Sequence, residues 1–190
     1  MRYLLVPWGL LFLWTGCASA APDDGFGRSR KLAGAHFDIY VPPEAVSADL
    51  VRGLDIGASD KLLAGAPVKS AGTTDEELAA SVDALFFLVC DILDMPLFSY
   101  KGSIKVCRDE EDLGRVYAAL FGKKPGAPMG SFYVHELNTI YIAAADFRRP
   151  VLGHEIGHAV ISNFFVVPSP MKVQEVLAGY VEYQLRKAAP

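Results

Sequence analysis

The sequence has few cysteines, tryptophans and histidines, and it lacks several patterns that are typical of particular classes of protein. Its 190 residues include three cysteines, two tryptophans and four histidines, and the formal net charge is −4. No basic run and no stripe of basic and aromatic residues occurs, so nucleic acid is not an expected partner. Internal repeats and low-complexity segments are also absent, which excludes repeat architectures. With 52% hydrophobic residues, the chain can form one domain with a substantial core.

The main apolar run lies near the N-terminus and is too short to span a bilayer. It covers residues Leu4 to Trp14 and is followed by a small-residue cleavage site at Ala18-Ser19-Ala20. This pattern predicts an export signal peptide over residues 1–20. A second interpretation is lipidation at Cys17, which would tether the chain to a membrane. Either way we expect an exported protein that is periplasmic, secreted or lipid-anchored in the cell envelope.

The scarcity of cysteine limits the covalent cross-links that the chain can form. Apart from Cys17, only Cys90 and Cys107 are present, an even number for an oxidising compartment. We therefore expect a disulfide between Cys90 and Cys107, which would stabilise the fold by about 3 kcal/mol in the chain-entropy model. The alternative is two buried free thiols that pack as small apolar residues.

Hydrophobic periodicity predicts a mixture of strands and helices. The polar, glycine-bearing segment 21–35 is expected to be a flexible tether, and residues 36–190 a single domain. Thr74 is the predicted N-cap of a long helix, with Glu77 as its capping-box partner. Strands are predicted at 36–41, 103–107, 131–135 and 139–143, and helices at 47–63, 74–94, 109–121, 151–162 and 171–186. This order favours an α+β fold with a mixed sheet.

The helix predicted at 151–162 carries the most informative motif, His154-Glu155-Ile-Gly-His158. On a helix, His154 and His158 lie one turn apart on the same face. Two ring nitrogens at that spacing can reach one metal ion about 2 Å away, as zinc requires. Glu155 could accept a proton from a water on the same ion. H-E-x-x-H on a helix is typical of zinc peptidases.

Catalytic zinc usually has a third protein ligand, and the sequence after the motif suggests which family supplies it. The place six residues after His158 holds Phe164, where metzincins have a histidine, so that family is excluded. The next predicted helix contains Glu175-Val-Leu-Ala178, followed by Tyr180 and Glu182. H-E-x-x-H followed by a helix with E-x-x-A resembles the gluzincins, in particular the compact bacterial peptidase-MA-like and minigluzincin proteins. The resemblance covers residues 36–186.

This resemblance implies a zincin-like fold, in which a small mixed sheet has an edge strand beside the cleft, and an active-site helix faces a glutamate helix. His154, His158 and Glu175 would bind one Zn²⁺ ion, and Glu155 would be the general base. A peptide or protein substrate would pair in extended form with the edge strand. By the same resemblance, the substrate-binding residues would be Thr139, Ile140, Tyr141, Ile142 and Ala143.

Two parts of the gluzincin pattern differ in this chain. Larger gluzincins supply a Tyr or His from a later subdomain to stabilise the oxyanion, and here Tyr180, Tyr183 or His135 could take that part. Each of the three is also explained as a packing or surface residue. Gly179 stands where some relatives have an acid that supports a histidine ligand. Backbone carbonyls or another carboxylate would then have to orient the histidines.

The function expected from these residues is that of an exported zinc metallopeptidase, in which a zinc-activated water attacks the peptide bond and Glu155 transfers its proton. Two alternatives stay open. One is an inert binding or assembly module that keeps the zinc site for stability, although structural zinc normally has four Cys or His ligands. The other is a zinc amidase that acts on cell-wall peptides with the same residues.

Overall fold

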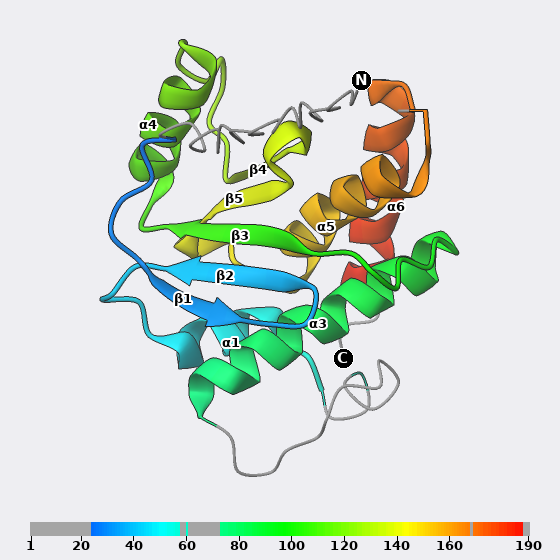
Figure 1. Ribbon diagram of the computed structural model, residues 1–190, viewed down its shortest axis with the longest axis horizontal. Coiled ribbons are helices and arrows are strands. Elements are labelled where there is room, and N and C mark those ends of the chain that lie inside the picture. Colours follow the sequence, from blue (N-terminus) through cyan, green and yellow to red (C-terminus); the bar gives the residue numbers. More distant parts are fainter. Residues whose placement is uncertain (1–23, 58–59, 61–72, 168, 188–190) are drawn as a thin grey trace, which may run out of the picture.

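The computed structural model describes residues 24–57, 60, 73–167 and 169–187. Over this part of the chain the fold is α+β, with helices around one five-stranded mixed sheet (Figure 1). The strands are β1 (Arg30–Ala33), β2 (Phe37–Val41), β3 (Gly102–Cys107), β4 (Ser131–Val134) and β5 (Thr139–Ala143). The helices are α1 (Ser47–Leu54), α3 (Thr74–Leu93), α4 (Glu110–Phe121), α5 (Arg149–Phe164) and α6 (Met171–Lys187), with short 3-10 turns at His135–Leu137 and Ala144–Asp146.

The order of strands in the sheet is β1-β2-β3-β5-β4. The three central strands, β2, β3 and β5, run parallel, because helices in the connections return the chain to the same end of the sheet. The two outer strands, β1 and β4, are antiparallel to their neighbours. Thus β4 and β1 form the two edges of the sheet.

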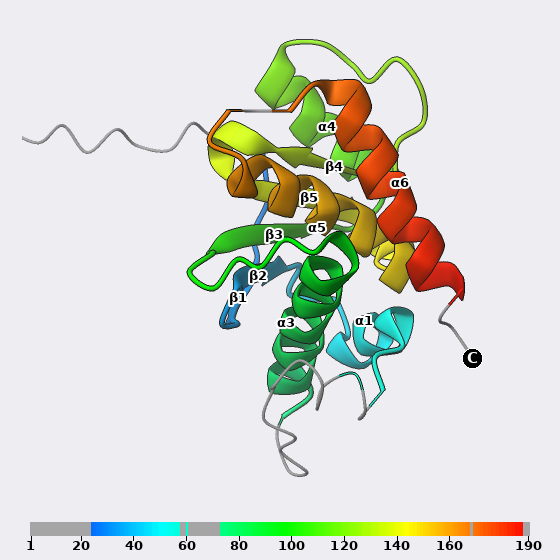
Figure 2. The same cartoon turned by 90° about the vertical axis from the view of Figure 1, so that its right-hand side faces the viewer.

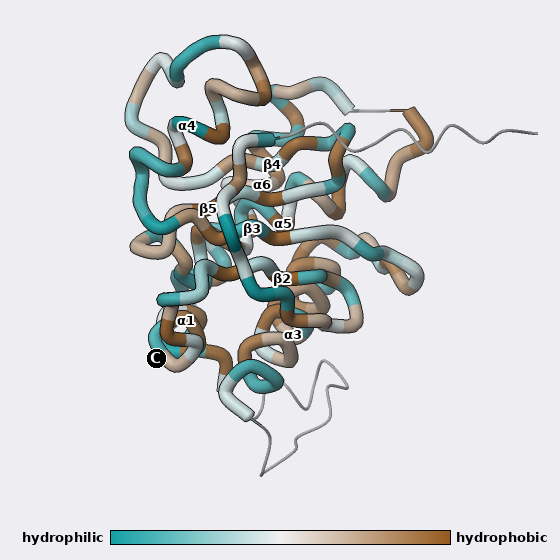
Figure 3. The backbone as a smooth tube through the Cα atoms, turned by 60° about the vertical axis from the view of Figure 1, so that its left-hand side comes forward, coloured by the Kyte–Doolittle hydropathy of each residue, from teal (hydrophilic) through white to brown (hydrophobic). Residues whose placement is uncertain are grey.

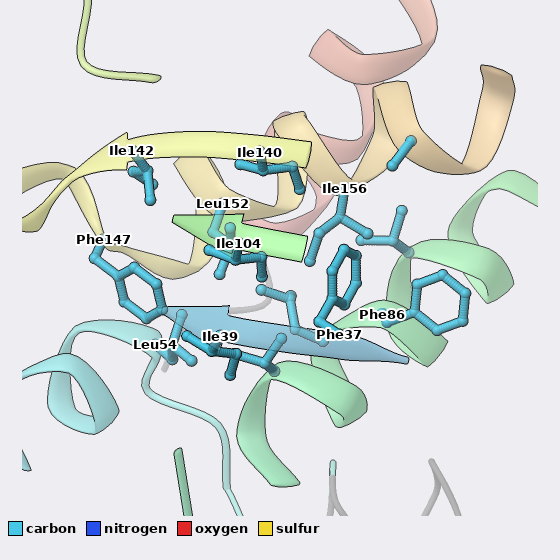
Figure 4. Packing of buried hydrophobic residues seen from close by; sticks show 14 of the residues in the cluster. Phe37, Ile39, Leu54, Phe86, Ile104, Ile140, Ile142, Phe147, Leu152 and Ile156 are labelled. Carbon is cyan, nitrogen blue, oxygen red and sulfur yellow. The ribbon is translucent and has the colours of Figure 1, made fainter. Parts of the chain in front are cut away.

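Alternation along the strands sends side chains to two different layers. On β3 and β5, Ile104, Ile140 and Ile142 join the larger core cluster, which contains residues of α1, α3, α5 and α6. Figure 4 shows these isoleucines packed with Phe37, Phe86 and Ile156. The opposite face forms a smaller cluster with α4, which includes Cys107, Leu113, Val116, Tyr141 and Ala143.

Helices α5 and α6 form an antiparallel hairpin whose helices lie side by side (Figure 2). The connector between the two helices contains the exposed apolar residues Val166 and Val167. Figure 3 colours the tube by hydropathy, with apolar stretches in brown along both α5 and α6. Pro170 precedes the first residue of α6, where its fixed φ is compatible with the start of a helix. The connector therefore brings the chain back, so that α6 packs along the helix that carries the histidine motif.

The N-cap of α3 is one residue earlier than predicted. Thr73, not Thr74, accepts a hydrogen bond from Glu76 N, and the Glu76 side chain accepts one from Thr73 N. The capping box is thus Thr73–Glu76. Two adjacent threonines followed by adjacent acids allow either register, and the sequence pattern alone does not choose between them.

The predicted tether at 21–35 is wrong over the residues that the structure describes. Residues 30–33 form β1, which pairs with β2 in the sheet. Asp24 is buried, accepts a hydrogen bond of 2.6 Å from Tyr141 Oη, and forms an ion pair with Lys105. Polar composition indicated a flexible segment, but main-chain pairing at a sheet edge needs no apolar side chains.

The helix predicted at 47–63 ends early. Helix α1 stops at Leu54, and Asp55 takes a left-handed conformation with φ of 47° as its C-cap. Short polar side chains adopt this conformation more readily than branched ones, so Asp55 is a reasonable stop. The residues at 58–59 and 61–72 lie outside the described part of the chain.

The prediction that 139–143 is the substrate-binding edge strand is wrong. Strand β5 lies between β3 and β4, and it pairs with both of them along its length. All five of its residues are buried, so neither its backbone nor its side chains face an open cleft. The edge on this side of the sheet is β4, which pairs antiparallel with β5 on the side away from β3.

The predicted Cys90–Cys107 disulfide is also wrong, since both cysteines are free and buried. Cys90 lies in the larger core cluster on α3, whereas Cys107 belongs to the smaller cluster next to α4. The sheet therefore separates the two sulfur atoms, although the two elements are neighbours in sequence. Burial raises the pKa of Cys90 to about 11 and that of Cys107 to about 12, so both thiols stay protonated.

The export signal at 1–20 and the lipidation site at Cys17 lie outside the described residues. Among the helices that the structure describes, none has both the length and the apolar character needed to cross a membrane.

Candidate metal centre

Helix α5 places both motif histidines on the face that looks toward α6. Pro150 stands in its first turn, where its missing N–H leaves no helical hydrogen bond unmade. The four-residue spacing then brings His154 Nε2 to within 3.2 Å of His158 Nε2. Two imidazole nitrogens of buried or half-buried rings therefore point to one place, as the motif predicts.

Helix α6 contributes the third group, Glu175. Its Oε2 lies 3.8 Å from His154 Nε2, and its Oε1 lies 3.7 Å from His158 Nε2. One ligand atom from each of His154, His158 and Glu175 lies within 4.8 Å of the others, which makes this a group that could hold a metal ion. The Glu175 side chain is 55% exposed, so Glu175 lies on the solvent side of this group of three residues.

Two glycines on α5, Gly153 and Gly157, allow α6 to pack closely against α5. This role was not predicted from the sequence. A Cβ atom on Gly157 would lie 3.4 Å from Ala178 Cα, and one on Gly153 would lie 2.1 Å from Leu185 Cδ1. At Gly157 the backbone of α5 thus lies directly against Ala178 of α6. Since Ala178 is one turn after Glu175, the small pair Gly157–Ala178 determines how near Glu175 comes to the histidines.

Enlarging Gly157 should therefore separate Glu175 from His154 and His158 without altering any of these three candidate ligands. We expect Gly157→Leu to weaken zinc affinity by about tenfold or more and to lower the melting temperature, because overpacking costs about 1–3 kcal/mol. Gly157→Ala is the matched control, since its Cβ meets Ala178 at an ordinary contact distance. Competition with a chromogenic chelator measures the affinity. Unchanged affinity in Gly157→Leu would show that helix separation does not control the site.

Glu155 lies in the same cleft but points to a different neighbour. The residue is 6% exposed, and its Oε1 accepts a hydrogen bond of 2.7 Å from Ser131 Oγ on β4. Burial raises the pKa of the Glu155 carboxyl to about 7; the nearby carboxylates of Glu175 and Glu182 act in the same direction, and the Ser131 hydrogen bond opposes them. A carboxyl with a pKa near neutrality is well suited to accept and return a proton.

Burial also keeps His158 in the form that binds metals. It lowers the pKa of His158 below its usual value, and the adjacent His154 acts in the same direction, whereas Glu175 opposes both. The ring is therefore neutral at neutral pH. A neutral imidazole has a free nitrogen lone pair, which metal coordination requires.

Glu182 is the carboxylate nearest to the other nitrogen of His154. Its Oε2 lies 3.3 Å from His154 Nδ1, on the side of the ring away from Glu175. Nδ1 is buried and makes no hydrogen bond with any residue that the structure describes, so the oxygen must lie off the direction of a ring N–H. Glu182 lies two helical turns after Glu175 and is placed to orient His154. Gly179, one turn before Glu182, has no side chain that could do so.

A cleft of about 560 Å³ opens beside these groups. Its lining includes Ser131–Val134 of β4 together with His154, Glu155, His158 and Glu175. The hydrogen bond from Ala143 N to Gly130 O sets the alternation of the β4–β5 ladder, so Phe132 and Val134 bond to β5. The N–H and C=O groups of Ser131 and Tyr133 then point away from β5, toward the open edge.

The structure brings together four of the predicted site residues: His154, Glu155, His158 and Glu175. Of the three oxyanion candidates, His135 lines the cleft, whereas Tyr180 and Tyr183 are exposed side chains of α6 outside its lining. Residues Thr139 to Ala143 lie in the sheet interior.

The contributions of Ser131 and Gly157 were not predicted, and another carboxylate was expected to orient the histidines, which is the place that Glu182 occupies beside His154. All three residues are visible in the sequence: Ser131 is a hydroxyl residue at the start of a strand, Gly157 lies inside H-E-x-x-H, and Glu182 is a second acid seven residues after Glu175. None of them indicates its partner, because each acts on a residue of another element. The geometry is therefore the main source of information on this site: no family model, no curated protein and no solved structure matches the chain.

Proposed function

We propose that this chain is an exported, zinc-dependent metallopeptidase of the gluzincin type with a zincin-like fold. The observation that carries the proposal is the arrangement of four side chains at one cleft. Three of them, His154, His158 and Glu175, converge with the spacing of metal ligands, while Glu155 stands apart from this group. A separate buried carboxylate beside three ligands is the arrangement expected for hydrolysis, since a purely structural site needs no such base.

The three donor atoms fit zinc. With bonds of about 2.0–2.1 Å, ligand atoms at two corners of a tetrahedron are about 3.3 Å apart. The two histidine nitrogens are 3.2 Å apart, and each has a different oxygen of Glu175 near it, Oε2 at 3.8 Å from His154 and Oε1 at 3.7 Å from His158. With one atom from each residue, all three lie within 4.8 Å, so the Glu175 side chain would have to move closer to bring one oxygen to both histidines. When bound there, zinc supplies Lewis-acid polarisation of the scissile carbonyl and lowers the pKa of water.

The edge strand β4 can hold a peptide in extended form. The outward N–H and C=O groups of Ser131 and Tyr133 are two residues apart, which is the repeat of an added β-strand. Because β4 lines the same cleft as the histidines, a peptide paired with it would lie across the metal-binding residues. This placement replaces residues 139–143 as the proposed substrate-binding strand.

Glu155 would perform the proton transfers. Its carboxylate accepts a proton from the attacking water and returns it to the amine as the peptide bond breaks. Low exposure keeps bulk water from competing for that proton. His135 is the oxyanion candidate that remains at the cleft, and it could donate a hydrogen bond to the developing charge.

The proposal is tested by turnover and metal content measured together. The mature, zinc-loaded protein should cleave a broad library of unstructured peptides near neutral pH, and a chelator should stop it until zinc is restored. Hydrolysis of cell-wall peptides alone would favour the amidase. One zinc per chain with no hydrolysis of any substrate would favour the inert binding module and would contradict the proposed function.

A further inference from the structure

Two residues of β4 attach this strand to the motif helix α5. Ser131 Oγ donates a hydrogen bond of 2.7 Å to Glu155 Oε1, and Asn163 Nδ2 donates one of 3.2 Å to Tyr133 Oη. Residues two apart on a strand share a face, so both side chains point to α5. The two contacts lie eight residues apart on the helix, about 12 Å along its axis. Strand and helix are thus connected at two separate points.

Ser131 contributes to the cleft through both its side chain and its main chain. Its side chain binds Glu155, while its own N–H and C=O face the open edge where an extended peptide would pair. The position of the carboxylate and the position of the backbone edge are therefore coupled through one residue. A displacement of either would change the distance between the two.

Glu155 depends on this contact. Within the described part of the chain, Ser131 is the one hydrogen-bond donor to its carboxylate. The other charged groups that influence it, Glu175 and Glu182, are carboxylates that repel it. Without the Ser131 hydroxyl, nothing described here would hold the carboxylate against β4.

We propose that Ser131 is a positioning residue that holds Glu155 in register with a peptide bound on β4. This inference rests on the proposed peptidase function. In the zinc-loaded enzyme the hydroxyl keeps the base beside the scissile bond, and the strand that supplies the hydroxyl also supplies the pairing groups. Ser131 itself exchanges no proton with the substrate.

Kinetics of three variants of the mature, zinc-loaded protein provide the first measurement. Ser131→Ala should lower kcat about tenfold or more, because misplacing a catalytic group is costly, while KM changes less than about twofold. Ser131→Thr, which keeps the hydroxyl, should restore most of kcat. Ser81→Ala is the matched control: Ser81 Oγ donates to Glu77 O in α3, away from the cleft, and its loss should leave kcat unchanged.

Strand β4 should stay in place in Ser131→Ala, which makes the kinetic result interpretable. Tyr133 remains bonded to Asn163, and its Oη also donates to Asn138 Oδ1 at 2.9 Å. Phe132 and Val134 keep their main-chain bonds to β5. Equal zinc content and equal melting temperatures in Ser131→Ala and Ser81→Ala would verify this.

Carboxyl labelling of the metal-free protein is independent of turnover. A water-soluble carbodiimide with an amine should modify Glu155 about fivefold faster in Ser131→Ala than in wild type, as expected for the loss of one hydrogen bond. Glu182, read in the same peptide digest, is the internal reference. Unchanged labelling of Glu155 overturns the inference, whatever kcat does. If wild type shows no turnover, the proposed function fails, while the labelling still decides whether Ser131 holds Glu155.

Discussion

Glu155→Gln should abolish peptide hydrolysis and leave zinc binding intact. An amide cannot accept the proton of the attacking water, and general-base catalysis is typically worth about 100- to 10,000-fold in rate. Glu155 is not among the three converging metal-binding residues, so the variant should keep one zinc per chain. Glutamine also retains an oxygen that can accept the Ser131 hydrogen bond. Turnover on peptides and zinc content, measured on the same preparation, test both statements.

The pH dependence of stability in the metal-free protein serves as an independent check on Glu155. Its pKa is raised from 4.5 to about 7 in the folded chain, so between these values the folded state binds more protons than the unfolded state. Wild-type stability should therefore fall as pH rises through this window, and the loss is complete above about pH 7. Glutamine does not ionise. Above pH 7, metal-free Glu155→Gln should be more stable than wild type by up to about 3 kcal/mol, and equally stable below pH 4.5.

Two results would contradict this assignment of Glu155. Hydrolysis that survives in Glu155→Gln would show that another group is the base. Loss of zinc in the variant would show that Glu155 belongs to the metal-binding group, and the distinction between base and ligands would then fail.

Glu175→Ala should weaken zinc binding far more than Glu182→Ala. Glu175 lies on the Nε2 side of both histidines, where a metal would sit, and its removal leaves two protein ligands of three. We expect a loss of more than about 100-fold in affinity, because partners behind a ligand already contribute about 10- to 100-fold. Glu182 contacts His154 Nδ1, on the far side of the ring, so Glu182→Ala should cost only about tenfold.

Chelator competition at a fixed pH measures both affinities on one scale. Glu136→Ala is a suitable control, since Glu136 is an exposed carboxylate at the rim of the same cleft and is not one of the converging residues. The reverse order, with Glu182→Ala the weaker binder, would make Glu182 the ligand and Glu175 a surface acid.

The sequence was a reliable guide wherever the relevant information is local. Helical spacing alone places His154 and His158 on one face, and the structure has their Nε2 atoms 3.2 Å apart. The strands at 103–107 and 139–143 and the helices at 109–121 and 171–186 were predicted to within a residue or two of their observed bounds. Side-chain periodicity and backbone geometry repeat over a few residues, so these features need no distant partner.

The edge strand, the cysteines and the supporting residues depended on contacts between distant elements. The resemblance to gluzincins predicted an edge strand at 139–143, and nothing in the sequence indicates that β4 lies outside β5 in the sheet. Cys90 and Cys107 are neighbours along the chain, yet the sheet lies between them. Strand order and the choice of sheet face are properties of the assembled layers, which a pattern of period two or 3.6 does not contain.

By itself the sequence determined the α+β class, the motif helix and the candidate residues for metal binding and proton transfer. Only the tertiary structure decided how near these residues come to one another and what supports them. Gly157 against Ala178 sets the separation of the two helices, and Ser131 reaches Glu155 from a strand 24 residues earlier. The physical reason is that metal and proton chemistry act over about 3 Å, and distances of that size between elements arise from packing.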